Sequence, residues 1–179
     1  MPANARTHWG WHELTERWAR DIVVTAGITS GDLVLDIGAG TGALTAPLVA
    51  AGARVVAVEL HPVRARVLRR RFADANVVVV ETDADDLRLP RRPFRVVANP
   101  PFALTTALLK RILQRGSALV TADVVVPRHV ARRWTQANAP GAHRWQQVYV
   151  PSTGLTLPAP AFRPPATQPA QVLRIRRVR

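Results

Sequence analysis

Residues 33–42 read Leu33-Val34-Leu35-Asp36-Ile37-Gly38-Ala39-Gly40-Thr41-Gly42. A short apolar run bounded by glycine is typical of a buried strand, and residues 43–51 have the composition of a compact helix stopped by Gly52. Glycine allows backbone conformations and close approaches that a Cβ atom would block, so a ligand can lie against this loop and the N-terminus of the helix. A dinucleotide-binding loop has the spacing G-x-G-x-x-G, whereas this loop has G-x-G-x-G.

Apolar runs alternate with helical stretches on both sides of this unit. We expect strands at 33–37, 55–59, 76–81, 94–98, 118–126, 144–150 and 171–175, and helices at 14–26, 43–51, 62–72, 105–113 and 127–136. This alternation predicts an α/β fold with a mostly parallel, seven-stranded sheet and helices on both faces. Right-handed crossovers place the carboxyl ends of parallel strands on one edge of the sheet.

The length suits a single domain over residues 1–179. We divide it into an N-terminal segment and helix (1–30), a core (31–150), and a C-terminal part (151–179) with a proline-rich loop, a final strand and a basic tail.

The composition is strongly basic, with 25 Lys and Arg against 12 Asp and Glu and a formal net charge of +13. Such a charge attracts polyanions. Coding bias explains the preference for arginine over lysine but not the shortage of acidic residues, so we expect a nucleic-acid partner. The absence of cysteine excludes disulfides, thiolate metal sites and a cysteine nucleophile. The histidines have no metal-ligand spacing and there is no apolar run near twenty residues, so we expect neither a metal nor a membrane partner. We also expect the protein to be a cytoplasmic monomer.

Polar residues follow the second and third strands. Glu59 ends the strand 55–59, where its carboxylate is placed to accept two ribose hydroxyls. Asp83 is placed to accept an adenine amine, while the Ala84 N–H meets a ring nitrogen. This layout suits an adenosyl ligand without a pyrophosphate, such as S-adenosylmethionine. A nucleotide-binding dehydrogenase and a purely structural turn remain open on these residues alone.

The fourth strand ends at Asn99-Pro100-Pro101-Phe102. The lone pair of an aromatic amine is delocalised into its ring, so two hydrogen-bond acceptors that hold both N–H bonds favour the tetrahedral nitrogen that methylation requires. The Asn99 side-chain oxygen and the Pro100 carbonyl are the natural pair, and proline stiffens the turn. Phe102 is placed to stack on a base pulled out of its helix. The alternative is a proline turn with Phe102 in the core.

Together, the glycine loop, Glu59, Asp83 and Asn99-Pro100-Pro101-Phe102 resemble the rRNA adenine N6-methyltransferases of the Erm and dimethyladenosine transferase family. The resemblance runs from about Trp11 to Ile175. It implies a Rossmann-like class I fold and S-adenosylmethionine as cofactor. For the Erm branch, it implies methylation of an adenine in 23S rRNA and resistance to macrolide, lincosamide and streptogramin B antibiotics. The implied cofactor-binding residues are His12, Leu14, Asp36, Gly38, Gly40, Glu59, Leu60, Asp83, Ala84 and Asn99.

Two departures from the family pattern stand out. The family's Gln-Asn-Phe-Leu segment, which touches the cofactor, is matched here by Trp11-His12-Glu13-Leu14, with His12 in the place of the asparagine. The family's helical, RNA-gripping C-terminal domain is expected to be absent, because the sequence stops at Arg179. The exposed arginines must then contribute more to RNA binding. We expect Arg128, Arg132 and Arg133, close to the catalytic edge, to contact RNA.

Several other interpretations stay open. Arg64 to Arg71 and Arg91-Arg92 are phosphate contacts or solvated surface, and Trp9 and Trp11 stack on bases or pack internally. The competing functions are a protein N-methyltransferase acting on a planar side-chain nitrogen, a DNA adenine methyltransferase, and an RNA-binding assembly factor without activity. The paired glutamates expected of arginine methyltransferases are not evident. The intact Asn99-Pro100-Pro101-Phe102 argues against the inactive factor.

Overall fold

The computed structural model describes residues 12–84 and 86–178. Its central sheet has the strand order β4-β3-β2-β5-β6-β9-β7. These strands are β2 (Leu33–Ile37), β3 (Arg54–Val58), β4 (Val77–Val80), β5 (Phe94–Ala98), β6 (Leu119–Pro127), β7 (Tyr149–Leu157) and β9 (Ala170–Arg177). Strands β2 to β6 pair in parallel, whereas β9 is antiparallel to both of its neighbours. The predicted α/β fold with a mostly parallel, seven-stranded sheet is therefore confirmed.

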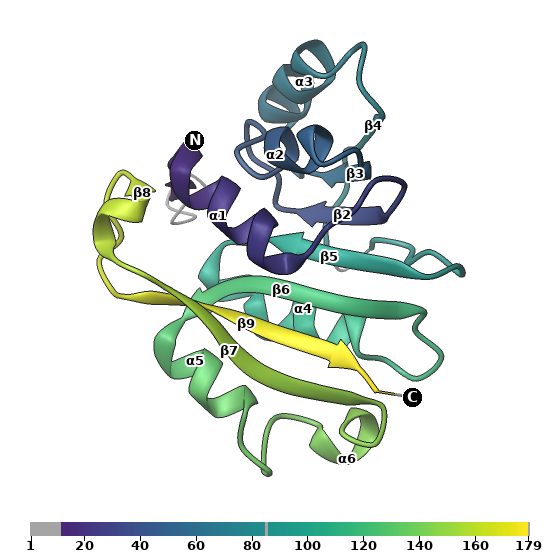
Figure 1. The fold of residues 1–179 in the computed structure, drawn as a ribbon, viewed down its shortest axis with the longest axis vertical. Helices are drawn as coiled ribbons and strands as arrows, with labels where there is room; N and C mark the ends of the chain where they lie inside the picture. The colour runs from purple at the N-terminus through teal and green to yellow at the C-terminus, as the bar shows by residue number, and fades with distance from the viewer. Residues whose placement is uncertain (1–11, 85, 179) are drawn as a thin grey trace, which may run out of the picture.

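Helices cover both faces of this sheet, with α1 in front and α4 behind in Figure 1. They are α1 (Glu16–Ala26), α2 (Thr45–Ala50), α3 (Pro62–Arg71), α4 (Thr105–Ile112), α5 (Arg128–Trp134) and α6 (Ala142–Trp145). Successive side chains of β2 point to opposite faces of the sheet. Leu35 packs in the core cluster that contains residues of α4 and α5, whereas Val34 packs in the cluster that contains residues of α1 and α2. All five residues of β2 are buried because both faces are covered.

Local sequence explains where two of the helices begin or end. Helix α1 stops at Gly27, which adopts the left-handed conformation with φ 65° that favours glycine. Helix α3 begins at Pro62, and the His61 ring accepts a hydrogen bond from the Val63 N–H at 3.2 Å. Both boundaries match the sequence prediction to within one residue.

The region after α5 differs from the prediction of a strand over residues 144–150. Residues 142–145 form α6, and β7 begins only at Tyr149. The Trp145 ring is buried by stacking on Trp134, with ring centroids 5.7 Å apart. This contact with α5 stabilises the helical conformation of the segment, although the apolar pattern of its sequence is typical of a strand.

The proline-rich stretch 151–169 is also more ordered than the predicted loop. Strand β7 runs through Pro151 to Leu157, and Pro151 is paired with Ile175 of β9. Because β7 is an edge strand, the missing N–H of proline is tolerated there. The chain then forms the short 3-10 helix η2 (Ala159–Ala161) and strand β8 (Phe162–Arg163).

Strand β8 holds the N-terminal segment at the carboxyl edge of the sheet. It pairs antiparallel with β1 (Glu13–Leu14), and the Thr15 N–H donates to the Ala161 carbonyl at 2.9 Å. Leu14 therefore lies in a strand rather than in the helix predicted from residue 14. Strand β5 points to the left of Figure 1, where β8 and the start of α1 also lie. No helix in the described part of the chain is long and apolar enough to cross a membrane.

Candidate active site

The glycine loop turns over the end of β3 directly after β2. The N–H groups of Gly38 and Ala39 both donate to the Val58 carbonyl, at 2.9 and 3.0 Å. Gly38 has φ 77°, and a Cβ atom there would lie 3.2 Å from the Pro100 Cα. Glycine at this position therefore lets the loop pack directly against the turn that carries Asn99, so the two predicted motifs form one site.

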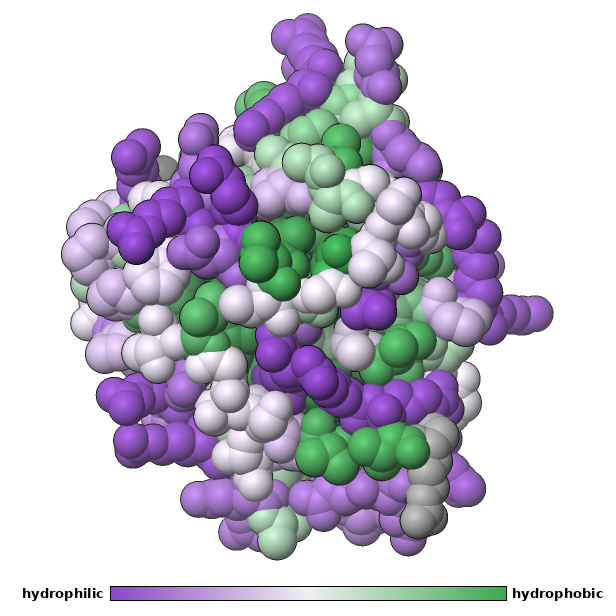
Figure 2. All heavy atoms as spheres, in the orientation of Figure 1, coloured by the Kyte–Doolittle hydropathy of each residue, from purple (hydrophilic) through white to green (hydrophobic). Residues whose placement is uncertain are grey.

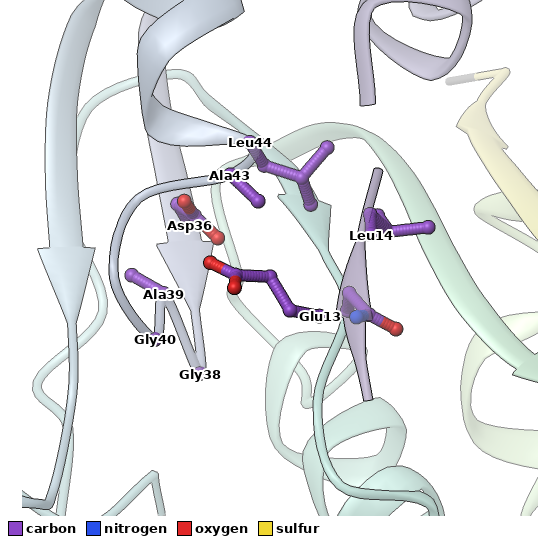
Figure 3. A pocket seen from close by; sticks show the side chains of 9 residues that line it. Glu13, Leu14, Asp36, Gly38, Ala39, Gly40, Ala43 and Leu44 are labelled. Carbon is purple, nitrogen blue, oxygen red and sulfur yellow. The ribbon is translucent and has the colours of Figure 1, made fainter. Parts of the chain in front are cut away.

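A small, open pocket lies beside this contact. Its lining comes from the glycine loop, the start of the following helical turn, β1 and the end of β5: Glu13, Leu14, Asp36, Gly38, Ala39, Gly40, Ala43, Leu44 and Asn99. Figure 3 shows the Glu13 and Asp36 side chains pointing into the space beside Ala39 and Gly40. Five of the predicted cofactor-binding residues thus meet here: Leu14, Asp36, Gly38, Gly40 and Asn99.

Glu59 holds the glycine loop through a hydrogen bond to Gly40. Its side chain is 4% exposed, and its Oε2 accepts a hydrogen bond from the Gly40 N–H at 2.9 Å. Its Oε1 accepts from the His61 N–H and from Arg64 Nη2, both at 2.8 Å. A carboxylate has about four acceptor positions, and three are used here. Glu59 therefore borders the pocket through Gly40.

The remaining residues predicted for the adenosyl end lie outside the pocket lining. Leu60 is half-exposed between Glu59 and α3. Asp83 and Ala84 follow β4 at the same edge of the sheet, and Ala84 packs against the core. None of these three residues is part of the pocket lining.

Asp36 is the most perturbed acid of the site. Its side chain is buried, and its Oδ2 accepts a hydrogen bond from the Thr45 hydroxyl at 2.7 Å. Burial, with a smaller contribution from the negative charge of Glu59, raises the pKa of Asp36 from 3.8 to about 7 even though the Thr45 hydrogen bond lowers it. Asp36 is therefore a carboxyl group that changes its charge near neutral pH.

The orientation of Asn99 is set by the N-terminal segment. Its Nδ2 donates to the His12 carbonyl at 2.8 Å. The side-chain oxygen is left to accept from another group. No hydrogen bond to the Pro100 carbonyl is found within residues 12–84 and 86–178. Asn99 lines the pocket, and the second acceptor predicted from the sequence is the carbonyl of the adjacent residue, Pro100, which is buried.

His12 is placed differently from the prediction. Its ring Nδ1 lies 3.0 Å from the Pro164 carbonyl, and its ring meets the Phe162 ring edge to face. The ring is not part of the pocket lining, so the contribution of His12 to the site is its backbone carbonyl on Asn99.

The residues predicted to touch RNA belong to different elements of the fold. Phe102 opens the short 3-10 helix η1 (Phe102–Leu104), is half-buried, and packs against the core cluster that contains Leu14. Arg128, Arg132 and Arg133 are exposed on α5, which follows β6 at the catalytic edge. Figure 2 shows hydrophilic side chains over this part of the molecule. Trp9 and Trp11 lie outside the described residues.

Arg91 and Arg92 lie elsewhere. They are exposed just before β5, at the amino end of the strand that carries Asn99 at its carboxyl end. Among residues 12–178 except 85, no cluster of three or more acidic or histidine side chains could hold a metal ion.

Sequence reasoning missed two polar residues that organise the site, Glu13 and Thr45. Glu13 lines the pocket and accepts a hydrogen bond from the Thr41 hydroxyl. Thr45 holds Asp36. The signal for Glu13 was its place in the segment that matches the family's Gln-Asn-Phe-Leu, but the segment alone did not show which side chains face the pocket.

Known proteins resemble this chain in sequence over most of its length. The model of the family described as "Ribosomal RNA adenine dimethylase" matches residues 3–156. The "rRNA adenine N-6-methyltransferase" of Corynebacterium diphtheriae is 36% identical over 152 residues, which cover 84% of this chain and 59% of the relative. The "Mycinamicin-resistance protein MyrB" of Micromonospora griseorubida is 39% identical, covering 69% of this chain and 41% of the relative. The "Ribosomal RNA small subunit methyltransferase A" of Anaeromyxobacter dehalogenans is 35% identical, covering 94% and 66%.

Among solved structures, the "23S rRNA methyltransferase ErmE" superposes with a TM-score of 0.81 at 26% identity, covering 92% of this chain and 69% of that one. This similarity agrees with the class I methyltransferase fold. The chain spans from 36% to 66% of the length of the curated relatives that it matches.

Proposed function

The chain belongs to the ribosomal RNA adenine dimethylase family, and from that premise we propose that it is the catalytic domain of an S-adenosylmethionine-dependent rRNA adenine N6-methyltransferase. Its proposed target is an adenine of 23S rRNA. Its proposed effect is resistance to macrolide, lincosamide and streptogramin B antibiotics. A cytoplasmic location and a monomeric state complete the proposal.

The observation that carries this proposal is the arrangement of Asn99. The hydrogen bond from Nδ2 to the His12 carbonyl leaves the side-chain oxygen as the acceptor at the pocket edge. The Pro100 carbonyl belongs to the next residue, whose Cα lies against Gly38. An aromatic amine has two N–H bonds, so an adenine amine at this place would have one acceptor for each.

The residues that line the pocket suit an adenosyl cofactor that carries positive charge. Its lining supplies the carboxyl groups of Glu13 and Asp36, and Gly38 and Gly40 leave the loop without side chains. When bound, S-adenosylmethionine supplies an electrophilic methyl group on its sulfonium sulfur. Glu59, Asp36, Gly38 and Gly40 would hold it.

The residues of the chain act on the amine. Asn99 Oδ1 and the Pro100 carbonyl would accept hydrogen bonds from its two N–H groups and favour a tetrahedral nitrogen, whose lone pair is then available for methylation. Rigid acceptors lower the activation barrier because they need no reorganisation during transfer. No general base is needed, because the ammonium formed by transfer is strongly acidic and loses its proton to water.

Similarity to a mycinamicin-resistance protein, MyrB, and to a 23S rRNA methyltransferase, ErmE, supports the choice of 23S rRNA and of resistance. A second candidate is small-subunit rRNA, which the name of the Anaeromyxobacter relative favours. A labelled methyl donor separates the two when it is offered with 23S rRNA, 16S rRNA, DNA or protein. We expect label on an adenine of 23S rRNA, and expression in a sensitive host should raise its erythromycin tolerance. Label on 16S rRNA alone would refute the proposed target, and label on DNA or protein alone would refute the proposed function.

A further inference from the structure

Glu13 places a carboxylate inside the pocket of an otherwise basic protein. The side chain comes from β1, lines the pocket, and points toward the glycine loop (Figure 3). The formal net charge of the whole chain is +13. A carboxylate that faces a pocket in such a protein would ordinarily attract one of the many arginines.

No arginine, lysine or histidine from the described residues forms an ion pair with Glu13. The five ion pairs found there join other acids to arginines, and the pair nearest the site is Glu59 with Arg64. The partner of Glu13 is instead the neutral hydroxyl of Thr41, which donates to Oε1. The carboxylate is therefore fixed in place by the glycine loop while its charge is left for another partner.

The remaining pocket lining gives the same electrostatic picture. It contains no basic residue, and its second acid is Asp36. Near neutral pH Asp36 is a partial anion, because burial raises its pKa to about 7. A cation in this pocket would thus find Glu13 as its main permanent counter-charge.

We propose that the Glu13 carboxylate binds the cationic end of the methyl donor, at its α-ammonium or its sulfonium group. This inference rests on the proposed function. The family's matching segment, Gln-Asn-Phe-Leu, has no acid, so the contact would be a property of this chain. It assigns Glu13 a role in donor binding, whereas its contact with Thr41 alone would make it a support for the glycine loop.

Calorimetric titrations with three related ligands test this role. S-adenosylmethionine carries both cationic groups, S-adenosylhomocysteine keeps only the ammonium, and 5′-methylthioadenosine lacks both. Glu13→Gln keeps the shape and can still accept a hydrogen bond from Thr41, but removes the charge. We expect it to weaken S-adenosylmethionine about tenfold, the usual scale of a charge-assisted hydrogen bond, and methylthioadenosine less than about threefold. Equal weakening of S-adenosylhomocysteine assigns the contact to the ammonium, and a smaller effect assigns it to the sulfonium.

Two further variants separate binding from loop support. Glu16→Gln removes the same charge from an exposed position in the first turn of α1, and it should leave all three affinities unchanged. Thr41→Val removes the hydroxyl that holds Glu13, and it should cost much less donor affinity than Glu13→Gln.

Three results would overturn the assignment of Glu13. They are an unchanged affinity for S-adenosylmethionine in Glu13→Gln, an equal loss for all three ligands, and a loss in Thr41→Val as large as that in Glu13→Gln. Failure of the proposed function would appear in the unaltered protein instead, either as no binding of S-adenosylmethionine or as label on DNA or protein alone.

Discussion

Asn99 receives its orientation from a residue that is 87 positions away in the sequence. Its amide nitrogen is committed to the His12 carbonyl, so the amide cannot turn its oxygen away from the pocket without breaking that bond. A side chain held in this way loses little freedom when it binds its substrate. The contribution of the Asn99 amide to catalysis can therefore be measured with a single substitution.

Asn99→Ala should lower turnover by about a hundredfold, because it removes one of two preorganised acceptors for the amine. Donor affinity should change little, since most of the pocket stays intact. Single-turnover kinetics and calorimetry on the same preparation measure the two effects. Turnover like that of the unaltered protein would mean that residues 99–102 form only a structural turn.

Glu59→Ala should raise the Kd of the donor at least tenfold. The change frees the Gly40 N–H and removes the one acceptor position that Gly40, His61 and Arg64 leave open for a ribose hydroxyl, and hydrogen bonds to charged groups contribute about 1.5–3 kcal/mol each. Glu81→Ala is the matched control, because Glu81 also pairs with an arginine of α3, at 3.0 Å, but is exposed. Equal affinities of the two variants would refute the assignment of Glu59.

Asp36→Asn should change the pH dependence of stability. Because the folded-state pKa of Asp36 is about 7 against 3.8, the folded chain holds more protons between these values. Its stability therefore falls as pH rises through this window. The asparagine variant lacks this contribution, so its stability relative to the unaltered protein should rise from pH 4 to pH 8, by on the order of a few kcal/mol. Urea unfolding at several pH values measures the difference, and a constant difference would contradict the pKa shift.

At the scale of elements, the pairing of β1 with β8 completes the site. Phe162 of β8 is 1% exposed and packs in the same core cluster as Leu14 of β1. The His12 ring contacts the same phenylalanine. The cluster therefore anchors the segment that supplies Glu13 to the pocket and the His12 carbonyl to Asn99.

Phe162→Leu should weaken donor binding although residue 162 does not line the pocket. The smaller side chain costs roughly 1 kcal/mol of stability and loosens β1 against β8. Phe94→Leu is the control, because Phe94 is equally buried but lies in the other core cluster, at the amino end of β5. Thermal unfolding should show similar losses for both variants, whereas calorimetry should show weaker donor binding only for Phe162→Leu. Equal donor affinities would mean that β8 does not support the pocket.

The elements also show why sequence reasoning succeeded in some places and failed in others. Strands β2 and β5 were predicted nearly to the residue, because their apolar runs reflect burial on both faces. The failure at α6 has a non-local cause, since Trp145 is buried by stacking on Trp134 of another helix. The position of the His12 ring depends on its contact with Pro164. The direction of the Glu13 side chain depends on the pairing of β1 with β8. Such pairings leave no local signal in the sequence.

At the scale of the whole molecule, the excess of arginine is distributed over both edges of the sheet. Arg128, Arg132 and Arg133 lie on α5 at the edge that carries Asn99. Arg91, Arg92 and Arg115 are exposed in the segments that precede β5 and β6, at the opposite edge. The two sets carry the same charge, so their comparison separates specific contacts from general attraction of RNA.

Replacing Arg128, Arg132 and Arg133 together by alanine should flatten the salt dependence of RNA binding. Each phosphate contact on single-stranded RNA contributes about 0.7 to the slope of log K against log salt, so the slope should fall by roughly two. Binding should weaken for many RNAs alike, because phosphate contacts carry no sequence information. Alanine at Arg91, Arg92 and Arg115 should change the slope less. Equal slopes for both triple variants would indicate general attraction, and a loss confined to the true target would indicate base contacts.

The pairing of β1 with β8 also has a consequence for the order in which the protein acquires its parts. The contact between His12 and Pro164 joins residues 152 positions apart. During translation the N-terminal segment emerges long before its partner, so a nascent chain has the glycine loop but not the complete wall of the pocket. Contacts between residues so far apart form late, because the entropy of closing the chain must be overcome first. A ligand that binds only the closed form stabilises it by mass action. The methyl donor would therefore act on the newly made chain as a folding ligand before it serves as a reactant.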